Sequence, residues 1–192
     1  MPEKIKKTQP ETPNENQGRD NFQTPNYAIE LLIPFIPKNI RSIWEPACGK
    51  HKISNVLLEN GYSVFSSDLG YPEPYDNFLT TDFPDEIKDG YAIITNPPYS
   101  LKRKFYERCK FHQVPFALLI PCDYCGWIID AIRLDNSEKI IPTRRIDFIT
   151  PSGKSGATGQ SSNYHSMWLT WGFGLGKSET FVELTIEQKK NI

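Results

Sequence analysis

An alternation of strand-like and helix-like segments, beginning after Asn39, constrains the fold of this chain more than any other feature. Short β-branched and apolar runs are separated by segments whose apolar residues recur with helical spacing. The expected strands are RSIW (41–44), YSVFSSD (62–68), YAIIT (91–95) and VPFALLI (114–120), and the expected helices are KISNVLLEN (52–60), KRKFYERCK (102–110) and DYCGWIIDAIRL (123–134). Strands that alternate with helices predict a doubly wound, mostly parallel, Rossmann-like α/β sheet.

Two later segments complete the expected sheet. RRIDFI (144–149) and SMWLTW (166–171) are strand candidates, and we expect them to form an antiparallel pair near the C-terminus. Gly61 predicts the end of the helix at 52–60, because glycine is favoured just beyond a helix C-terminus.

The composition is that of one ordinary domain. The 192 residues, of which 38% are hydrophobic, can bury one sizeable core but not two. We expect a flexible arm at 1–19, a folded domain at 20–180 and a short tail at 181–192. No segment resembles a membrane span or signal peptide, and four cysteines without secretory features predict a cytoplasmic location. With a net charge of −1, nucleic-acid binding would need a local basic patch.

Chemically distinctive residues follow the expected strands at their carboxyl ends. Glu45-Pro46-Ala47-Cys48-Gly49 follows the first strand, Asp68 ends the second, and Asn96-Pro97-Pro98-Tyr99 follows YAIIT. In doubly wound sheets, ligands bind at these ends, beside the point where the strand order reverses. A glycine turn lets a ligand approach backbone N–H groups, and the acid can accept hydrogen bonds from a ribose diol. The combination favours an adenosine-containing cofactor, although each feature alone is more often a tight turn or a helix cap.

Taken in order, five sequence blocks resemble those of one enzyme family. The blocks are DNFQTP (20–25), EPACGK (45–50), the strand end at Asp68, TDF (81–83) and NPPY (96–99). Together they resemble the S-adenosylmethionine-dependent DNA adenine-N-methyltransferases, in particular the small Dam-like type of phages and mobile elements. The resemblance implies a seven-stranded methyltransferase sheet, S-adenosyl-L-methionine as cofactor and adenine in DNA, including single-stranded DNA, as substrate. It also implies a phage-encoded enzyme acting in a bacterial host cell.

The NPPY block gives this resemblance its chemistry. An aromatic exocyclic amine is a poor nucleophile because its lone pair is delocalised into the ring. Asn96 Oδ1 and the Pro97 carbonyl could accept its two N–H bonds, while Pro97 and Pro98 restrict the backbone that holds these acceptors. Tyr99 offers a face on which an extruded base can stack. The alternative interpretation is a rigid proline turn after a buried strand.

The remaining site residues are carried over by match to the family. The cofactor-binding positions are Phe22, Thr24, Pro25, Glu45, Ala47, Cys48, Gly49, Asp68, Asp82, Phe83 and Asn96. The resemblance implies that Asp68 binds the ribose, that Asp82 and Phe83 contact the adenine ring, and that residues 45–49 line the methionine half. The block at 22–25 would close over the cofactor carboxylate.

Simpler structural interpretations exist for several of these residues. Asp68 could be a helix cap, and Asp82 could be an ordinary solvated acid. Thr24 could cap a helix, with Pro25 in its first turn.

One position departs from the family pattern. The family usually has G-x-G in the first motif, whereas this chain has Gly49-Lys50-His51. The Cβ of His51 could crowd the cofactor and weaken its binding, or the turn could be shifted. A catalytically inactive relative is the corresponding alternative, but the intact NPPY favours activity.

Basic residues surround the expected site. They are Lys102, Arg103, Lys104, Arg108 and Lys110 after NPPY, and Lys50, Lys52, Arg144, Arg145 and Lys154 near other strand ends. They could follow the phosphates of a nucleic acid, or form an ordinary solvated surface. The polar segment 150–166 adds Lys154, Gln160, Asn163 and Tyr164, which could reach phosphates or base edges. Alternatively, this segment is only a hairpin connection.

The Cys122-x-x-Cys125 spacing invites a zinc or redox interpretation. Without a second such pair or paired histidines, we expect packing residues and no metal. The sequence thus predicts a DNA adenine methyltransferase. The alternatives are an RNA adenine or guanine methyltransferase, a protein-glutamine methyltransferase and a non-catalytic nucleic-acid-binding module.

Overall fold

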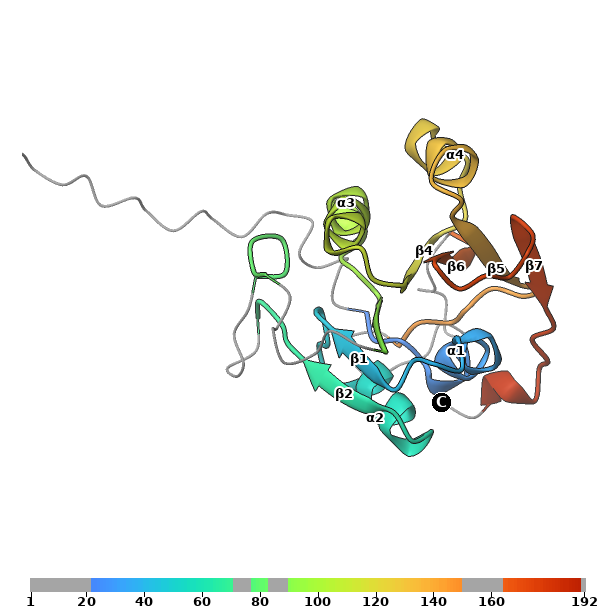
Figure 1. Ribbon diagram of the computed structural model, residues 1–192. Helices are drawn as coiled ribbons and strands as arrows, with labels where there is room; N and C mark the ends of the chain where they lie inside the picture. Colours follow the sequence, from blue (N-terminus) through green and yellow to red (C-terminus); the bar gives the residue numbers. More distant parts are fainter. Residues whose placement is uncertain (1–21, 71–76, 83–89, 150–163, 191–192) are drawn as a thin grey trace, which may run out of the picture.

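The protein forms one seven-stranded sheet with helices on both faces. The computed structural model describes residues 22–70, 77–82, 90–149 and 164–190 (Figure 1). The strands are β1 (Ser42–Glu45), β2 (Ser63–Ser66), β3 (Tyr91–Thr95), β4 (Phe116–Pro121), β5 (Glu138–Pro142), β6 (Ser166–Trp171) and β7 (Glu179–Val182). They are ordered β2-β1-β3-β4-β6-β5-β7, and only β6 runs antiparallel to its neighbours. The Rossmann-like, mostly parallel seven-stranded sheet is therefore confirmed.

The helices pack in two layers against this sheet. They are α1 (Asn26–Glu30), α2 (Lys52–Glu59), α3 (Lys102–His112) and α4 (Gly126–Arg133), with short 3₁₀ turns at Ile33–Phe35, Tyr99–Leu101 and Gln188–Lys190. Figure 1 shows α1 and α2 on one face, and α3 and α4 on the other. Each face has its own core, and neighbouring strand residues alternate between them. In β1, Ile43 joins the core under α1 and α2, whereas Trp44 joins the opposite core.

Most of the expected elements are confirmed with small shifts at their ends. The helix at 52–60 ends at Glu59, and Gly61 follows with a φ of 85° in the left-handed region. The helix expected from residue 123 begins only at Gly126, because Asp123 forms a turn whose carboxylate accepts the Cys125 N–H (3.3 Å).

The prediction of a strand at 144–149 is wrong. β6 pairs instead with β5, and in the 144–149 segment only Ile149 makes a bridge, to Gln23. Ile146 and Phe148 are buried, so the alternation seen in the sequence is real. The backbone between them nevertheless bonds outside the sheet, where the Asp147 N–H donates to the Tyr27 hydroxyl (2.7 Å).

The packed structure also continues beyond the expected domain end at residue 180. β7 runs to Val182, and Leu184 is completely buried. The start of the segment expected to be a tail is thus part of the fold. The expected arm at 1–19 lies outside the described residues.

The site position follows from the strand order. β1 lies between β2 and β3 in the sheet. The chain therefore places β2 on one side of β1 and then returns across β1 to form β3 on the other side. The reversal point lies at the carboxyl ends of β1 and β3, where doubly wound folds bind ligands. The residues that follow Glu45 and Thr95 are therefore placed side by side.

Gly90 lies just before β3, and its replacement tests the backbone contacts between the starts of β1 and β3. Its carbonyl accepts the Arg41 N–H (2.8 Å), its φ is 76°, and an added Cβ would lie 2.9 Å from the Asn39 carbonyl oxygen. We expect Gly90→Ala to lower the free energy of unfolding by more than ~2 kcal/mol, since strain and a backbone clash combine.

Gly61→Ala is the matched control, because its φ is also positive but nothing lies within 4 Å of the added Cβ. It should cost only ~1 kcal/mol. Urea denaturation of the two variants measures the difference, and equal losses would contradict the clash.

Candidate active site

Three segments that are far apart in the sequence meet at the carboxyl ends of β1 and β3. The Gln23 side chain accepts the Lys50 N–H (3.1 Å), which joins the 22–25 segment to the turn after β1. The neighbouring Thr24 hydroxyl accepts a hydrogen bond from Asn96 Nδ2 (3.1 Å). Residues 22–25, 45–51 and 96–99 thus form one cluster, as their matches to family motifs predict.

The turn before α2 has left-handed backbone at two residues, and one of them is His51. Gly49 has a φ of 48°, and His51, which replaces the second glycine of G-x-G, has a φ of 58°. A histidine therefore adopts the left-handed backbone that glycine takes easily, and strain of ~1–2 kcal/mol is expected at this position. The Gly49 N–H donates to Asp68 Oδ2 (2.9 Å), and Asp68 Oδ1 accepts the Gly70 N–H (2.7 Å).

Asp68 is thus part of the turn itself. It does not cap a helix through these bonds, because both donors lie outside helices. A carboxylate offers about four acceptor positions, so two backbone donors leave capacity for a ligand hydroxyl.

Glu45 is buried between β1 and α2. It is 1% exposed, and its carboxylate accepts the Ser54 N–H (2.8 Å) and the Ser54 hydroxyl at the start of α2. Desolvation by burial raises its pKa from 4.5 to about 8, although the hydrogen bonds from Ser54 oppose the shift. Burial likewise raises the pKa of the Cys48 thiol to about 12, helped by the nearby Glu45 and Asp68 charges. Cys48 is therefore a buried, protonated thiol at neutral pH.

Asn96 is the most informative residue of the site. Its Nδ2 is engaged by Thr24, whereas its Oδ1 is buried and has no hydrogen-bond partner among the described residues. A buried acceptor without a donor is costly, about 1–3 kcal/mol, and needs an explanation such as a missing ligand.

Thr24 does not cap α1. The residue before the helix is Pro25, and no side-chain cap is formed there. The helix-start interpretation of Thr24 is therefore wrong.

The rest of NPPY forms a braced turn. Pro97 is buried, and Tyr99 begins the 3₁₀ turn that leads into α3. The Tyr99 hydroxyl lies 3.2 Å from the Ser166 hydroxyl at the start of β6. Its ring also meets Phe148 edge-on, at 6.3 Å between centroids. Contacts on two sides thus fix the orientation of the tyrosine beside Asn96.

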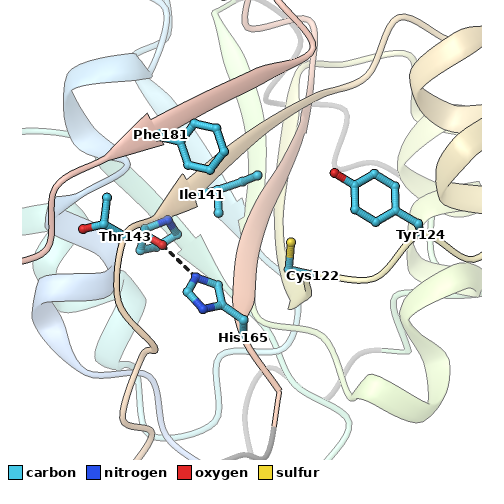
Figure 2. A pocket seen from close by; sticks show the side chains of 7 residues that line it. Cys122, Tyr124, Ile141, Thr143, His165 and Phe181 are labelled. Carbon is cyan, nitrogen blue, oxygen red and sulfur yellow. Dashed lines mark hydrogen bonds between the residues drawn. The ribbon is translucent and has the colours of Figure 1, made fainter.

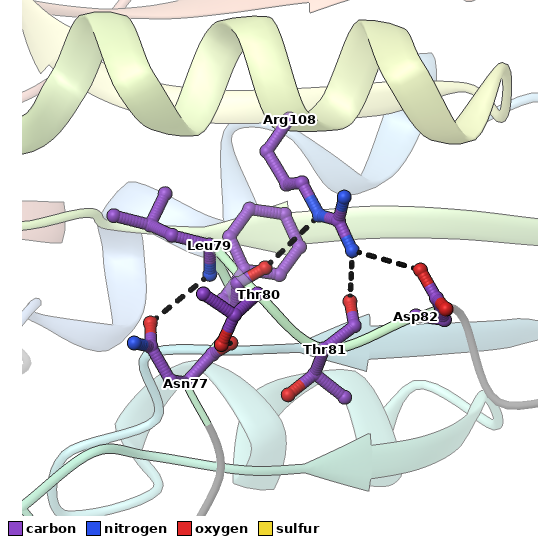
Figure 3. Close-up of polar contacts among 7 residues, drawn as sticks. Asn77, Leu79, Thr80, Thr81, Asp82 and Arg108 are labelled. Atoms are coloured by element: carbon purple, nitrogen blue, oxygen red, sulfur yellow. Dashed lines mark hydrogen bonds and ion pairs between the residues drawn. The ribbon is translucent and has the colours of Figure 1, made fainter.

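The 77–82 segment is attached to α3 by one arginine (Figure 3). Arg108 donates to the carbonyls of Phe78 and Thr81 and pairs with Asp82 (3.1 Å). The Asp82 side chain is 91% exposed, and Phe78 packs in the core against Trp44. Arg108 thus holds Asp82 beside α3, and Phe83 lies outside the described residues.

Most basic residues of α3 are already paired with acids. The pairs are Lys102–Asp123 (3.3 Å), Arg103–Glu107 (2.8 Å), Arg108–Asp82 (3.1 Å) and Lys110–Asp135 (3.5 Å). Lys104 is exposed and has no acidic partner in the described part of the chain. Pairing reduces the charge that this helix offers to phosphates. Tyr164 is exposed, and Lys154, Gln160 and Asn163 lie outside the described residues.

Cys122 and Cys125 are free thiols, and Figure 2 shows Cys122 beside a hollow at the edge of the sheet. Burial raises the pKa of both thiols, and Cys122 lines the hollow. In residues 22–70, 77–82, 90–149 and 164–190, no group of three or more potential metal ligands is found. The same ranges contain no helix long and apolar enough to cross a membrane.

Some functional contacts were not predicted from the sequence. Gln23 lies inside the DNFQTP block, so its place beside matched residues was the only available indication. Ser54 and Ser166 carry no pattern that distinguishes them from surface serines. Their roles come from pairing with Glu45 and Tyr99 across the fold.

Comparison with known proteins finds similar structures but no similar sequences. The chain matches no protein-family profile and no curated protein sequence. It is similar to the crystal structure of a type I restriction-modification system methyltransferase subunit from Streptococcus thermophilus, with 13% identity and a TM-score of 0.58. The match covers 88% of this chain and 52% of that one, so the chain spans about half the length of the subunit.

A dimethyladenosine transferase from Plasmodium falciparum matches with 12% identity and a TM-score of 0.47, over 78% of this chain and 62% of that one. This second likeness is too low to carry an argument. The likeness to the restriction-modification subunit shows a Rossmann-like methyltransferase fold.

Glu45 predicts a distinctive pH dependence. Because its pKa is raised in the folded state, the unfolded chain ionises first as the pH rises from 4.5 to about 8. Its contribution to stability is therefore fully present below pH 4.5 and is lost through this window. Glu45→Gln keeps an oxygen acceptor for Ser54 and should raise the free energy of unfolding at pH 8 by ~1–3 kcal/mol.

Urea titrations of both proteins at pH 5 and pH 8 measure the effect. The gain should be smaller at pH 5 than at pH 8. A gain that is independent of pH would show that Glu45 does not titrate in this window.

Proposed function

We propose that this protein transfers a methyl group from S-adenosyl-L-methionine to the exocyclic amino group of adenine in DNA. The observation that carries the proposal is the buried, unpartnered Oδ1 of Asn96 at the strand-order reversal. An exocyclic amine supplies the N–H donor that this oxygen lacks. Thr24 engages Nδ2, and this directs the acceptor side of the amide to the ligand.

The substrate amine would be held by two acceptors in a restricted turn. Asn96 Oδ1 and the Pro97 carbonyl would accept its two N–H bonds, so that the nitrogen lone pair is localised for attack. The prolines hold these acceptors in place, and the braced ring of Tyr99 would stack on the extruded base. Orientation of this kind supplies much of the rate in a group transfer.

The residues after β1 and β2 fit the cofactor. When bound, S-adenosyl-L-methionine supplies an activated methyl group on its sulfonium. The positive-φ turn at 49–51 brings backbone close to the ligand position, and Asp68 retains acceptor capacity for the ribose. The 22–25 segment lies against this turn through Gln23, as a segment closing over the cofactor would.

The structural relative supports DNA as the substrate. The Streptococcus thermophilus protein is a methyltransferase subunit of a type I restriction-modification system. The shared fold and the Asn96 geometry favour an amine in a nucleic acid over a protein glutamine, because Tyr99 offers a stacking surface. Tritiated-methyl transfer to DNA, RNA and protein in parallel is the experiment that tests this choice.

Removing the Asn96 amide should abolish transfer while sparing the cofactor. We expect Asn96→Ala to reduce kcat by at least ~100-fold, because the amine loses its orienting acceptor. Calorimetric affinity for S-adenosyl-L-methionine should stay within a few fold. Asn55→Ala is the control, since Asn55 is an exposed asparagine on α2. Turnover like that of the wild type in Asn96→Ala would exclude the mechanism.

Replacing Asp68, in contrast to replacing Asn96, should weaken the binding of S-adenosyl-L-methionine. Asp68→Ala removes an acceptor for the ribose and loosens the turn at Gly49, so affinity should fall by an amount worth ~1.5–3 kcal/mol. Asp130→Ala, an exposed acid on α4, controls for the change in net charge. Unchanged calorimetric affinity would remove Asp68 from the cofactor site.

A further inference from the structure

A second hollow lies on the same sheet edge as Asn96, but on the far side of β4. It has a volume of about 440 Å³, within the range of small-ligand sites. Figure 2 shows Tyr124 and Cys122 facing Ile141 and Phe181 across it, beside the hydrogen bond from His165 to the Pro142 carbonyl (2.7 Å). The lining is therefore mostly apolar and aromatic.

Tyr124 is held rigidly at the mouth of this hollow although it is 62% exposed. Its hydroxyl donates to Glu179 Oε1 (2.7 Å), and Lys139 Nζ lies 4.1 Å from its ring centroid. Lys139 is only 1% exposed and pairs with the same Glu179. A half-buried ion pair thus orients an exposed aromatic ring, so that little further ordering is needed before the ring binds a flat partner.

Phe181 supplies a second exposed ring. It lies on the edge strand β7, pairs with Ile141 in register, and is 67% exposed. Two exposed aromatic residues around one hollow suit planar rings, and stacking on aromatic side chains is how proteins hold successive bases of single strands.

The charges beside the hollow favour a nucleic acid. Arg144 and Arg145 are exposed and directly follow Thr143, which lines the hollow. Of the acids on and after β7, Glu179 is paired with Lys139, whereas Glu183 and Glu187 are exposed. Arg144 and Arg145 are thus the basic groups beside the hollow that would bind phosphates.

The distance from the hollow to Asn96 equals the length of a few nucleotides of a single strand. Asn96 follows β3, and the hollow spans the ends of β4, β6, β5 and β7. At ~4.8 Å between neighbouring strands, its centre lies ~10–15 Å along the sheet edge. This corresponds to roughly three to four stacked nucleotides at 3.4 Å each.

From these observations we infer that the hollow between Tyr124 and Phe181 binds a nucleobase of the substrate strand, roughly three to four nucleotides from the methylated adenine. The inference rests on the proposed function. It gives the enzyme a stacking contact outside the NPPY turn, and it assigns phosphate binding to Arg144 and Arg145, whereas most basic residues of α3 are paired.

The test is an abasic scan of one substrate. A labelled single-stranded oligonucleotide is chosen whose one adenine accepts tritiated methyl from the wild-type enzyme, and each flanking base is removed in turn. Anisotropy titrations should show one or two positions where the missing base weakens wild-type binding by roughly 5- to 100-fold. In Tyr124→Ala and Phe181→Ala, removal of the same base should change the binding affinity by no more than ~2-fold. In these variants the base no longer stacks on the aromatic ring, so its removal takes away little binding energy.

Two variants serve as controls. Tyr124→Phe keeps the ring and should retain most of the abasic effect. Phe111→Ala removes an equally exposed aromatic residue on α3 and should leave the effect unchanged.

The experiment distinguishes a wrong inference about the hollow from a wrong proposed function. If the wild type methylates DNA but no flanking position depends on Tyr124 or Phe181, the hollow is not a base site and the proposed function stands. If no DNA accepts methyl from the wild type, both fall together.

Discussion

Complete burial of β3 is the constraint on which the rest of the structure depends. All five of its side chains are buried, so both of its edges must be paired, with β1 on one side and β4 on the other. This strand is central and parallel to both of its neighbours, and its carboxyl end opens at the strand-order reversal. The prolines after Asn96 end the pairing at this point, which leaves the asparagine at the sheet edge with a fixed backbone.

The site is then completed by parts of the chain that carry little regular structure. Residues 22–25 bridge to Ile149 through paired backbone hydrogen bonds (2.8 and 2.9 Å) and reach both the glycine turn and Asn96. Ser166 braces Tyr99 from the antiparallel strand. The two halves of the sheet therefore meet at the same few side chains, and loss of order in either half is expected to disturb the site.

Local patterns in the sequence predicted most of the sheet, the helices and the residues at the strand ends, because burial and period are local properties. They could not predict β5, where Lys139 sits in a core position that only its pairing with Glu179, 40 residues later, makes tolerable. They also misplaced 144–149, since an alternating segment can bury Ile146 and Phe148 without pairing as a strand. Likewise, the Thr24–Asn96 bond joins residues 72 positions apart, and no local pattern records it.

The left-handed conformation of His51 has a consequence for how quickly the turn can respond to a ligand. A glycine at this position would let the loop explore many conformations, both in the unfolded chain and in local openings of the native state. Histidine has far fewer alternatives, so the strain at this residue is accompanied by stiffness. A turn that is already narrow in its motions loses little entropy when a ligand is bound, and it is slow to rearrange when the ligand leaves. The left-handed backbone at His51 is therefore expected to make this turn stiffer than a turn with glycine at residue 51.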